Sequence, residues 1–84
     1  MSAISVRTLD FFDRYNIKKI VEKYGFDEKT ALRKFILSET YRMLVDKELE
    51  LYTVSPEIIF DMWEAEQVTG NPRNSLYLRR DEYV

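Results

Sequence analysis

The chain contains no cysteine and no histidine among its 84 residues. Without cysteine it forms no disulfide and offers no thiolate to a metal, a composition that fits a reducing compartment. Without histidine it also lacks the commonest general base and a frequent zinc ligand. Acid–base chemistry would depend on carboxylates, tyrosine or lysine, and the sequence assembles none of these into a catalytic pattern. We therefore expect no enzyme active site, no cofactor and no bound metal.

Glycine and proline are also scarce, with two of each. The two glycines, Gly25 and Gly70, lie far apart and form no glycine-rich loop that could cradle phosphates. No apolar run approaches the roughly 20 residues that a membrane-spanning helix needs. The segment 1–8 lacks the apolar centre of a signal peptide. We expect a cytoplasmic protein that does not enter a membrane.

Apolar and aromatic side chains are plentiful, at 45% and 14% of the residues. This supply suits one modest core in a single domain, 1–84, because a chain of this size buries only roughly 60% of its unfolded surface. Charge is distributed unevenly along the chain. Basic and acidic residues number nine and six in 1–45, one and seven in 46–66, and three and two in 67–84. We expect the basic front part to lie against the acidic middle.

The segment 55–70 has the clearest helical signature. Ser55 suits the N-cap, Pro56 the first helical position, and Gly70 the position just past the end. Apolar residues spread around more than half of this helix, so it is either sandwiched between neighbours or has one side left for a partner. The apolar residues are Ile58, Ile59, Phe60, Met62, Trp63, Ala65 and Val68.

A stripe of three carboxylates, Glu57, Asp61 and Glu64, follows one face of the same helix. Carboxylate oxygens can bind a hard cation such as Mg²⁺, but such sites draw ligands from several elements. No second acidic helix is present to complete a coordination shell. We therefore expect a solvated stripe rather than a metal site.

Two earlier segments, 7–24 and 28–45, are also predicted to be helical. Gly25 ends the first, Asp27 suits the N-cap of the second, and Phe26 can pack on it as a hydrophobic staple. The apolar stripe changes face near Asn16 in the first segment, which either a bend or contact on two sides would explain. It also changes face near Ser38 in the second segment, where the serine either faces solvent or starts a short helix. A break at either point would add a fourth helix to the three main ones.

The remaining segments are predicted to be non-helical. Apolar and polar residues alternate over 49–54, which favours a short extended segment. Residues 1–6 are expected to fray, and Asn71-Pro72 opens an extended tail over 71–84. The predicted fold is an all-α bundle with a short extended segment and an extended C-terminal tail.

Protein–protein interaction is the leading functional hypothesis, in the form of a docked partner or a homodimer. Trp63 suits the core, whereas Phe60 is expected to face outward because the last helix has more apolar surface than one contact needs. The tail adds aromatic and basic groups. The proposed partner contacts are Ile59, Phe60, Trp63, Tyr77 and Arg79.

A nucleic-acid-binding regulator is the alternative, because basic residues flank the turn at Gly25. A helix-turn-helix reader needs a recognition helix with exposed polar side chains, and the second helix here is apolar on two faces. The tail arginines could also bind phosphates or pair with the acidic stripe. The candidate nucleic-acid contacts are Lys18, Lys19, Lys29, Arg33 and Lys34.

Three runs of the chain, LRKFILSETYRMLVD, SPEIIFDMWEAE and TGNPRNSLYLR, resemble small uncharacterised bacterial helical proteins. Some of these proteins lie in toxin–antitoxin-like gene neighbourhoods. The resemblance covers roughly Thr8 to Arg79 and defines no catalytic residue. It implies a protein partner, such as a toxin.

Overall fold

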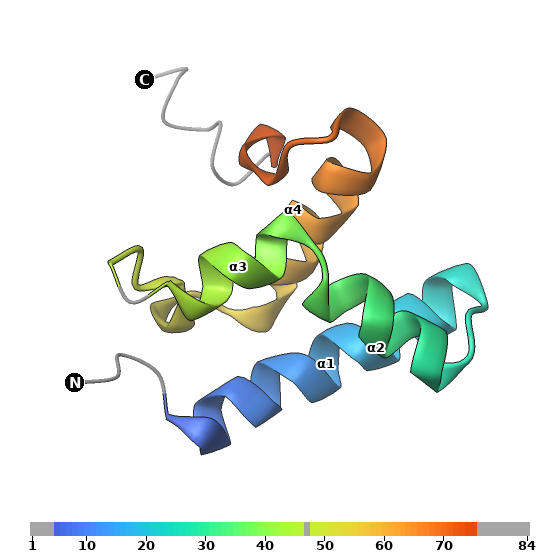
Figure 1. Ribbon diagram of the computed structural model, residues 1–84, viewed down its shortest axis with the longest axis horizontal. Helices are drawn as coiled ribbons and strands as arrows, with labels where there is room; N and C mark the ends of the chain where they lie inside the picture. The colour runs from blue at the N-terminus through green and yellow to red at the C-terminus, as the bar shows by residue number, and fades with distance from the viewer. Residues whose placement is uncertain (1–4, 47, 76–84) are drawn as a thin grey trace.

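The computed structural model describes residues 5–46 and 48–75. The described residues form an all-α fold without a strand, as predicted. In Figure 1, α2 lies against one half of α1, and α4 passes behind α3. The shortest dimension of the molecule is 18 Å, which corresponds to two layers of helices about 10 Å across. The elements are α1 (Val6–Tyr24), α2 (Glu28–Ile36), α3 (Glu39–Val45), η1 (Leu51–Thr53), α4 (Pro56–Thr69) and η2 (Pro72–Asn74).

Helix α1 runs without a break, so of the two explanations for its change of apolar face, a bend near Asn16 or contact on two sides, the second is correct. The Asn16 side chain is buried, and its Nδ2 donates to the Phe12 carbonyl at 2.9 Å, one turn back along the same helix. The two apolar stripes of α1 arise because α2 and α4 both pack on it. Ser5 caps the start and Gly25, at φ 75°, ends the helix. Val6 is helical, and residues 1–4 of the predicted frayed end lie outside the described residues.

The predicted break near Ser38 is confirmed and separates α2 from α3. Ser38 adopts extended backbone angles, and its Oγ accepts the Tyr41 N–H at 3.1 Å and donates to the Phe35 carbonyl at 2.5 Å. Both partners are backbone groups left over at a helix end. The serine therefore ends one helix and begins the next, which gives four α-helices among the described residues.

The segment predicted to be extended, 49–54, instead contains the 3₁₀ turn η1. Glu50 has a positive φ of 53°, and the Thr53 hydroxyl donates back to the Glu50 carbonyl at 2.7 Å. Leu51 is buried, so this turn is anchored to the core. Alternation over six residues indicated a strand, but the described chain has no strand to pair with it, and local hydrogen bonds satisfy the backbone instead.

Helix α4 supplies the centre of the core. Trp63 is 2% exposed, stacks on Phe60 with ring centroids 6.2 Å apart, and meets Tyr24 edge to face at 5.7 Å. Its indole N–H donates to the Lys34 carbonyl at 3.4 Å, which ties α4 to α2. Pro56 and Gly70 mark the ends of α4 as predicted, although the Ser55 side chain makes no capping hydrogen bond. The other buried apolar residues are Phe12, Ile20, Ala31, Phe35, Met43, Leu44, Leu51, Ile59 and Met62.

After Gly70 the chain turns back onto α4 through η2. Pro72 is buried, and the Ser75 hydroxyl donates to the Asp61 carboxylate. The predicted extended tail over 71–84 is thus a packed turn as far as Ser75, and its remainder lies outside the described residues. None of the helices in the described ranges has the length and apolar character that a bilayer crossing requires.

Candidate interaction surface

The side chains of α4 that were predicted to contact a partner are in the core. Ile59, Phe60 and Trp63 are 0%, 7% and 2% exposed, so the expectation that Phe60 faces outward is wrong. The physical reason is that α1, α3 and η2 all pack on α4 and together bury its broad apolar surface. The two other predicted contacts, Tyr77 and Arg79, lie outside the described residues. A docking surface must be sought elsewhere.

Apolar side chains are exposed on the outer side of α2. This helix buries Ala31 and Phe35 against the core, while Leu32 and Ile36, one turn apart, remain 41% and 39% exposed. Leu37 follows at the end of the helix and is 75% exposed. We call Leu32, Ile36 and Leu37 the α2 patch. Helix α2 therefore carries buried and exposed apolar side chains next to each other.

Two hollows extend this surface from the α2 patch toward α1. The first has a volume of about 440 Å³ and is lined by Leu32 together with Ile17 of α1. The second, about 540 Å³, lies between α1 and α2, where Ile17 and Val21 form its apolar wall. Both include Glu28, so they adjoin. The polar lining of the two hollows comprises Arg14, Lys18, Glu22, Asp27, Glu28 and Lys29.

Basic side chains border the α2 patch. Lys29, Arg33 and Lys34 surround a further hollow of about 320 Å³, and Lys18 stands on the α1 side of the surface. None of these four forms an ion pair within the described part of the chain. Lys34 does lie over the ring of Phe26, 4.9 Å from its centroid. The surface thus combines aliphatic groups with cations that are free to meet an anionic partner.

Of the five predicted nucleic-acid contacts, Lys19 lies apart from the other four. It lines the cleft between α1 and α4, with its ammonium group 5.8 Å from the centre of the Tyr15 ring. The structure therefore brings Lys29, Arg33 and Lys34 together on α2 and places Lys18 beside them, but it does not assemble the complete set. Lys18 and Lys19 are adjacent in the sequence and lie about 100° apart around α1, so they line different hollows.

The cleft between α1 and α4 has a volume of about 440 Å³ and contains the predicted carboxylate stripe. Glu64 accepts the Tyr24 hydroxyl and forms an ion pair with Lys23 at 2.6 Å, and Asp61 accepts from Ser75. These two carboxylates are engaged rather than simply solvated. No acidic cluster in the described residues has the arrangement of a metal site.

The directions of the pKa shifts of Tyr24 and Glu64 agree with a structural role for this cleft. The hydrogen bond to Glu64, helped by burial, raises the pKa of Tyr24 to about 12. Partial burial opposes ionisation of Glu64, but the hydrogen bonds from Lys23 and Tyr24 outweigh it and lower the pKa of that carboxyl. Both shifts favour the protonated tyrosine and the ionised carboxylate. The group ties the end of α1 to α4.

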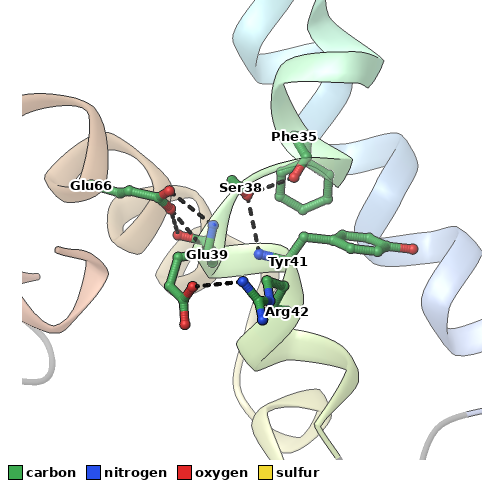
Figure 2. A network of polar contacts seen from close by, with 7 residues as sticks. Phe35, Ser38, Glu39, Tyr41, Arg42 and Glu66 are labelled. Atoms are coloured by element: carbon green, nitrogen blue, oxygen red, sulfur yellow. Dashed lines mark hydrogen bonds and ion pairs between the residues drawn. The ribbon is translucent and has the colours of Figure 1, made fainter. Parts of the chain in front are cut away.

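Another carboxylate of α4, that of Glu66, holds the corner at Ser38, next to the α2 patch. Figure 2 shows Glu66 reaching across to the start of α3. Its oxygens accept the backbone N–H groups of Glu39 and Thr40 at 2.8 and 2.9 Å, and the Thr40 hydroxyl at 2.7 Å. These are donors that a helix N-terminus leaves unpaired. Because the corner at Ser38 is held in this way, Ile36 and Leu37 are presented in a defined orientation.

Comparisons with protein families, curated proteins and solved structures find no match for this chain. Its function is therefore inferred from the residues and the geometry described above.

Proposed function

We propose that this protein is a protein–protein interaction module whose α2 patch and adjoining hollows dock an acidic amphipathic helix of a partner protein. The observation that carries the proposal is the exposure of Leu32, Ile36 and Leu37, at 41%, 39% and 75%, along α2 and at its C-cap. They lie beside cations that form no ion pair with any described residue. Such a surface differs from the α4 contacts expected from the sequence.

The apolar part of the surface supplies a reason to bind. Fully burying a leucine or isoleucine side chain contributes about 1.5–3 kcal/mol, so this small domain exposes three side chains that could instead add to its stability. An amphipathic helix contacts such surfaces through apolar residues one turn apart, and this spacing matches that of Leu32 and Ile36. The hollow beside Ile17 offers a place for one further apolar side chain.

The charged part of the surface specifies the partner's chemistry. The cations Lys18, Lys29, Arg33 and Lys34 still outnumber the neighbouring carboxylates, which are those of Glu22, Asp27 and Glu28. Acidic residues bordering the apolar stripe of a partner helix would meet these cations, which steers association and fixes orientation. A basic or uncharged partner helix would lack this complementarity.

The setting proposed for the module is the bacterial cytoplasm, in an antitoxin-like role. The absence of cysteine supports a reducing compartment, and the resemblance to helical proteins of toxin–antitoxin-like gene neighbourhoods supports a toxin as the partner. An antitoxin needs a surface that covers part of its target. The α2 patch is that surface in this proposal.

Docking is tested by titrating the ¹⁵N-labelled protein with a synthetic helical peptide that carries leucine on one face and glutamate on both sides of it. We expect amide shifts to change along α2 and around Ile17, and Leu37→Asp to abolish the changes. Val68→Asp is the matched control, because Val68 is 84% exposed on α4. Shift changes confined to α4, or none at all, would refute the proposal. A concentration-dependent dimer broken by Leu37→Asp would make a second copy the occupant instead.

A nucleic-acid-binding regulator is the second candidate, because Lys18, Lys29, Arg33 and Lys34 form no ion pair among the described residues. If all four contacted phosphates, the logarithm of the binding constant for duplex DNA would fall with the logarithm of salt concentration at a slope of about −3.6. Fluorescence anisotropy at several salt concentrations measures this slope. Binding of the acidic peptide that needs Leu37, together with no binding of duplex DNA, would favour the protein partner.

A further inference from the structure

Two buried oxygen atoms on the inner side of α1 lack a hydrogen-bond donor. They are Asp13 Oδ1 and Asn16 Oδ1, and neither has a partner within residues 5–46 and 48–75. Asn16 is 0% exposed, and its amide nitrogen already donates to the Phe12 carbonyl at 2.9 Å. Residues three apart on a helix share one face, so the two oxygens belong to neighbouring side chains. Buried acceptors without a donor are rare in folded proteins.

We propose that Asp13 and Asn16 form a proton-operated pair, in which the Asp13 carboxylic acid donates its O–H to Asn16 Oδ1. One proton taken from solvent turns one of these two neighbouring acceptors into a donor, and its return to solvent restores the unpaired state. The change between the two states needs only this proton. This inference goes beyond the proposed function and does not depend on it, because neither residue belongs to the α2 patch.

The surroundings of Asp13 favour the protonated form. Burial raises the pKa of this carboxyl from 3.8 to about 6, and the negative charge of Asp10 on the same helix adds to the shift. Asp10 is itself paired with Arg14 at 2.8 Å. Tyr41 of α3 faces Asp13 from the other side, and its own pKa is raised by burial and by that carboxylate. Ionisation of Asp13 therefore places a charge against a tyrosine rather than against a cation.

The consequence is a pH-dependent contact between α1 and α3. The folded protein holds the Asp13 proton more tightly than the unfolded chain does, so this contribution to stability is full below pH 3.8 and is lost as the pH rises to about 6. Tyr41 packs edge to face on Phe35 at 5.3 Å, which links the pair to the corner between α2 and α3. Loosening would start at this contact.

The experiment is an NMR titration of the full chain that follows the Asp13 carboxyl carbon and the Asn16 side-chain amide together. We expect both to change with one midpoint near pH 6, since the Asn16 oxygen senses the proton directly. In Asn16→Leu the neutral acid loses its acceptor, so the Asp13 midpoint should move toward 3.8. Asp10→Asn is the control, which should lower the midpoint slightly and leave the coupling to the Asn16 amide intact.

Two results would overturn the proposal. One is an Asp13 midpoint near 3.8 in the unaltered protein. The other is an Asn16 amide signal that does not move while Asp13 titrates, which would assign the raised pKa to burial alone. This second readout uses the unaltered protein, so it decides the matter even if Asn16→Leu does not fold.

Discussion

Glu66 accepts hydrogen bonds from both the backbone N–H and the hydroxyl of Thr40, at 2.9 and 2.7 Å, so a side chain of α4 caps the start of α3. Capping is usually local, from the serine or threonine just before the helix. Here Ser38 provides the local cap and Glu66 a distant one. The packing of α4 on α3 is therefore reinforced by charge-assisted hydrogen bonds, which are stronger than neutral ones.

Replacing Glu66 by Gln should lower the free energy of unfolding by about 1–2 kcal/mol, because the charge at the helix N-terminus is lost and the hydrogen bonds weaken. Urea denaturation followed by circular dichroism measures the change. Glu57→Gln, an exposed carboxylate on the same helix, should change stability by less than about 0.5 kcal/mol. Equal effects of the two substitutions would show that Glu66 contributes no cap.

Phe60→Asp should unfold the protein rather than block an association. Phe60 is 7% exposed and stacks on Trp63, so a carboxylate there loses a packed ring and buries a charge. Loss of a buried phenylalanine alone costs about 3–5 kcal/mol, most of the stability of a domain of this size. The helical circular dichroism signal at 25 °C is the readout. A fully helical Phe60→Asp protein would mean that the ring is dispensable to the core.

Leu37→Asp should leave the fold unchanged while it weakens docking. The Leu37 side chain is 75% exposed, and exposed substitutions usually change stability by less than about 0.5 kcal/mol. Thermal denaturation of the variant, compared with the titration by the acidic peptide, separates the two effects. A large drop in melting temperature would instead identify Leu37 as part of the folding core.

Acid should weaken the contact between α1 and α4 through Glu64. Because the Glu64 pKa is lowered in the folded state, its contribution to stability is present above the ordinary value of 4.5 and is lost as the pH falls through the folded value. The Lys23 partner is 57% exposed, so screening by solvent should keep the effect below about 1 kcal/mol. Tyr24→Phe should reduce it, as measured by urea midpoints below and above pH 4.5. An unchanged acid dependence in that variant would exclude the tyrosine hydroxyl as a contributor.

These two titrations can be told apart because they act in opposite directions. Protonation of Asp13 stabilises the folded protein, whereas protonation of Glu64 destabilises it. In Glu64→Gln only the Asp13 effect remains, so stability should fall as the pH rises from 3.8 to about 6. In Asp13→Asn only the Glu64 effect remains, so stability should fall as the pH drops below 4.5 and should change little between 4.5 and about 6.

Helix ends with local signals could be predicted from the sequence. Gly25 and Gly70 take left-handed backbone angles at the ends of α1 and α4, and Ser38 divides α2 from α3, as their residue types indicate. The sequence left open whether the first helix bends near Asn16 or is contacted on two sides, and the prediction of an extended segment failed over 49–54, where no described strand pairs with it. In each case the outcome depended on neighbours that a local pattern does not reveal.

The location of the exposed apolar surface could not be predicted for a related reason. Both the segment containing Leu37 and the segment containing Phe60 are apolar on more than one side, and spacing alone does not say which side is covered. Phe60 is buried because α1, α3 and η2 pack around α4, whereas Leu37 lies at the corner between α2 and α3 and is 75% exposed. A clue was available in the basic residues of α2, which mark it as partly solvent-facing.

The cap at Thr40 also bears on the order in which the chain folds. Helix α3 has seven residues, fewer than the roughly 12–15 at which an isolated helix becomes marginally stable in water. Its distant cap lies 26 residues further along, so α3 has little to hold it until α4 has formed and docked. In kinetic terms α3 and α4 should consolidate in one late step, while α1 and α2 are joined by a short local turn and can pair early.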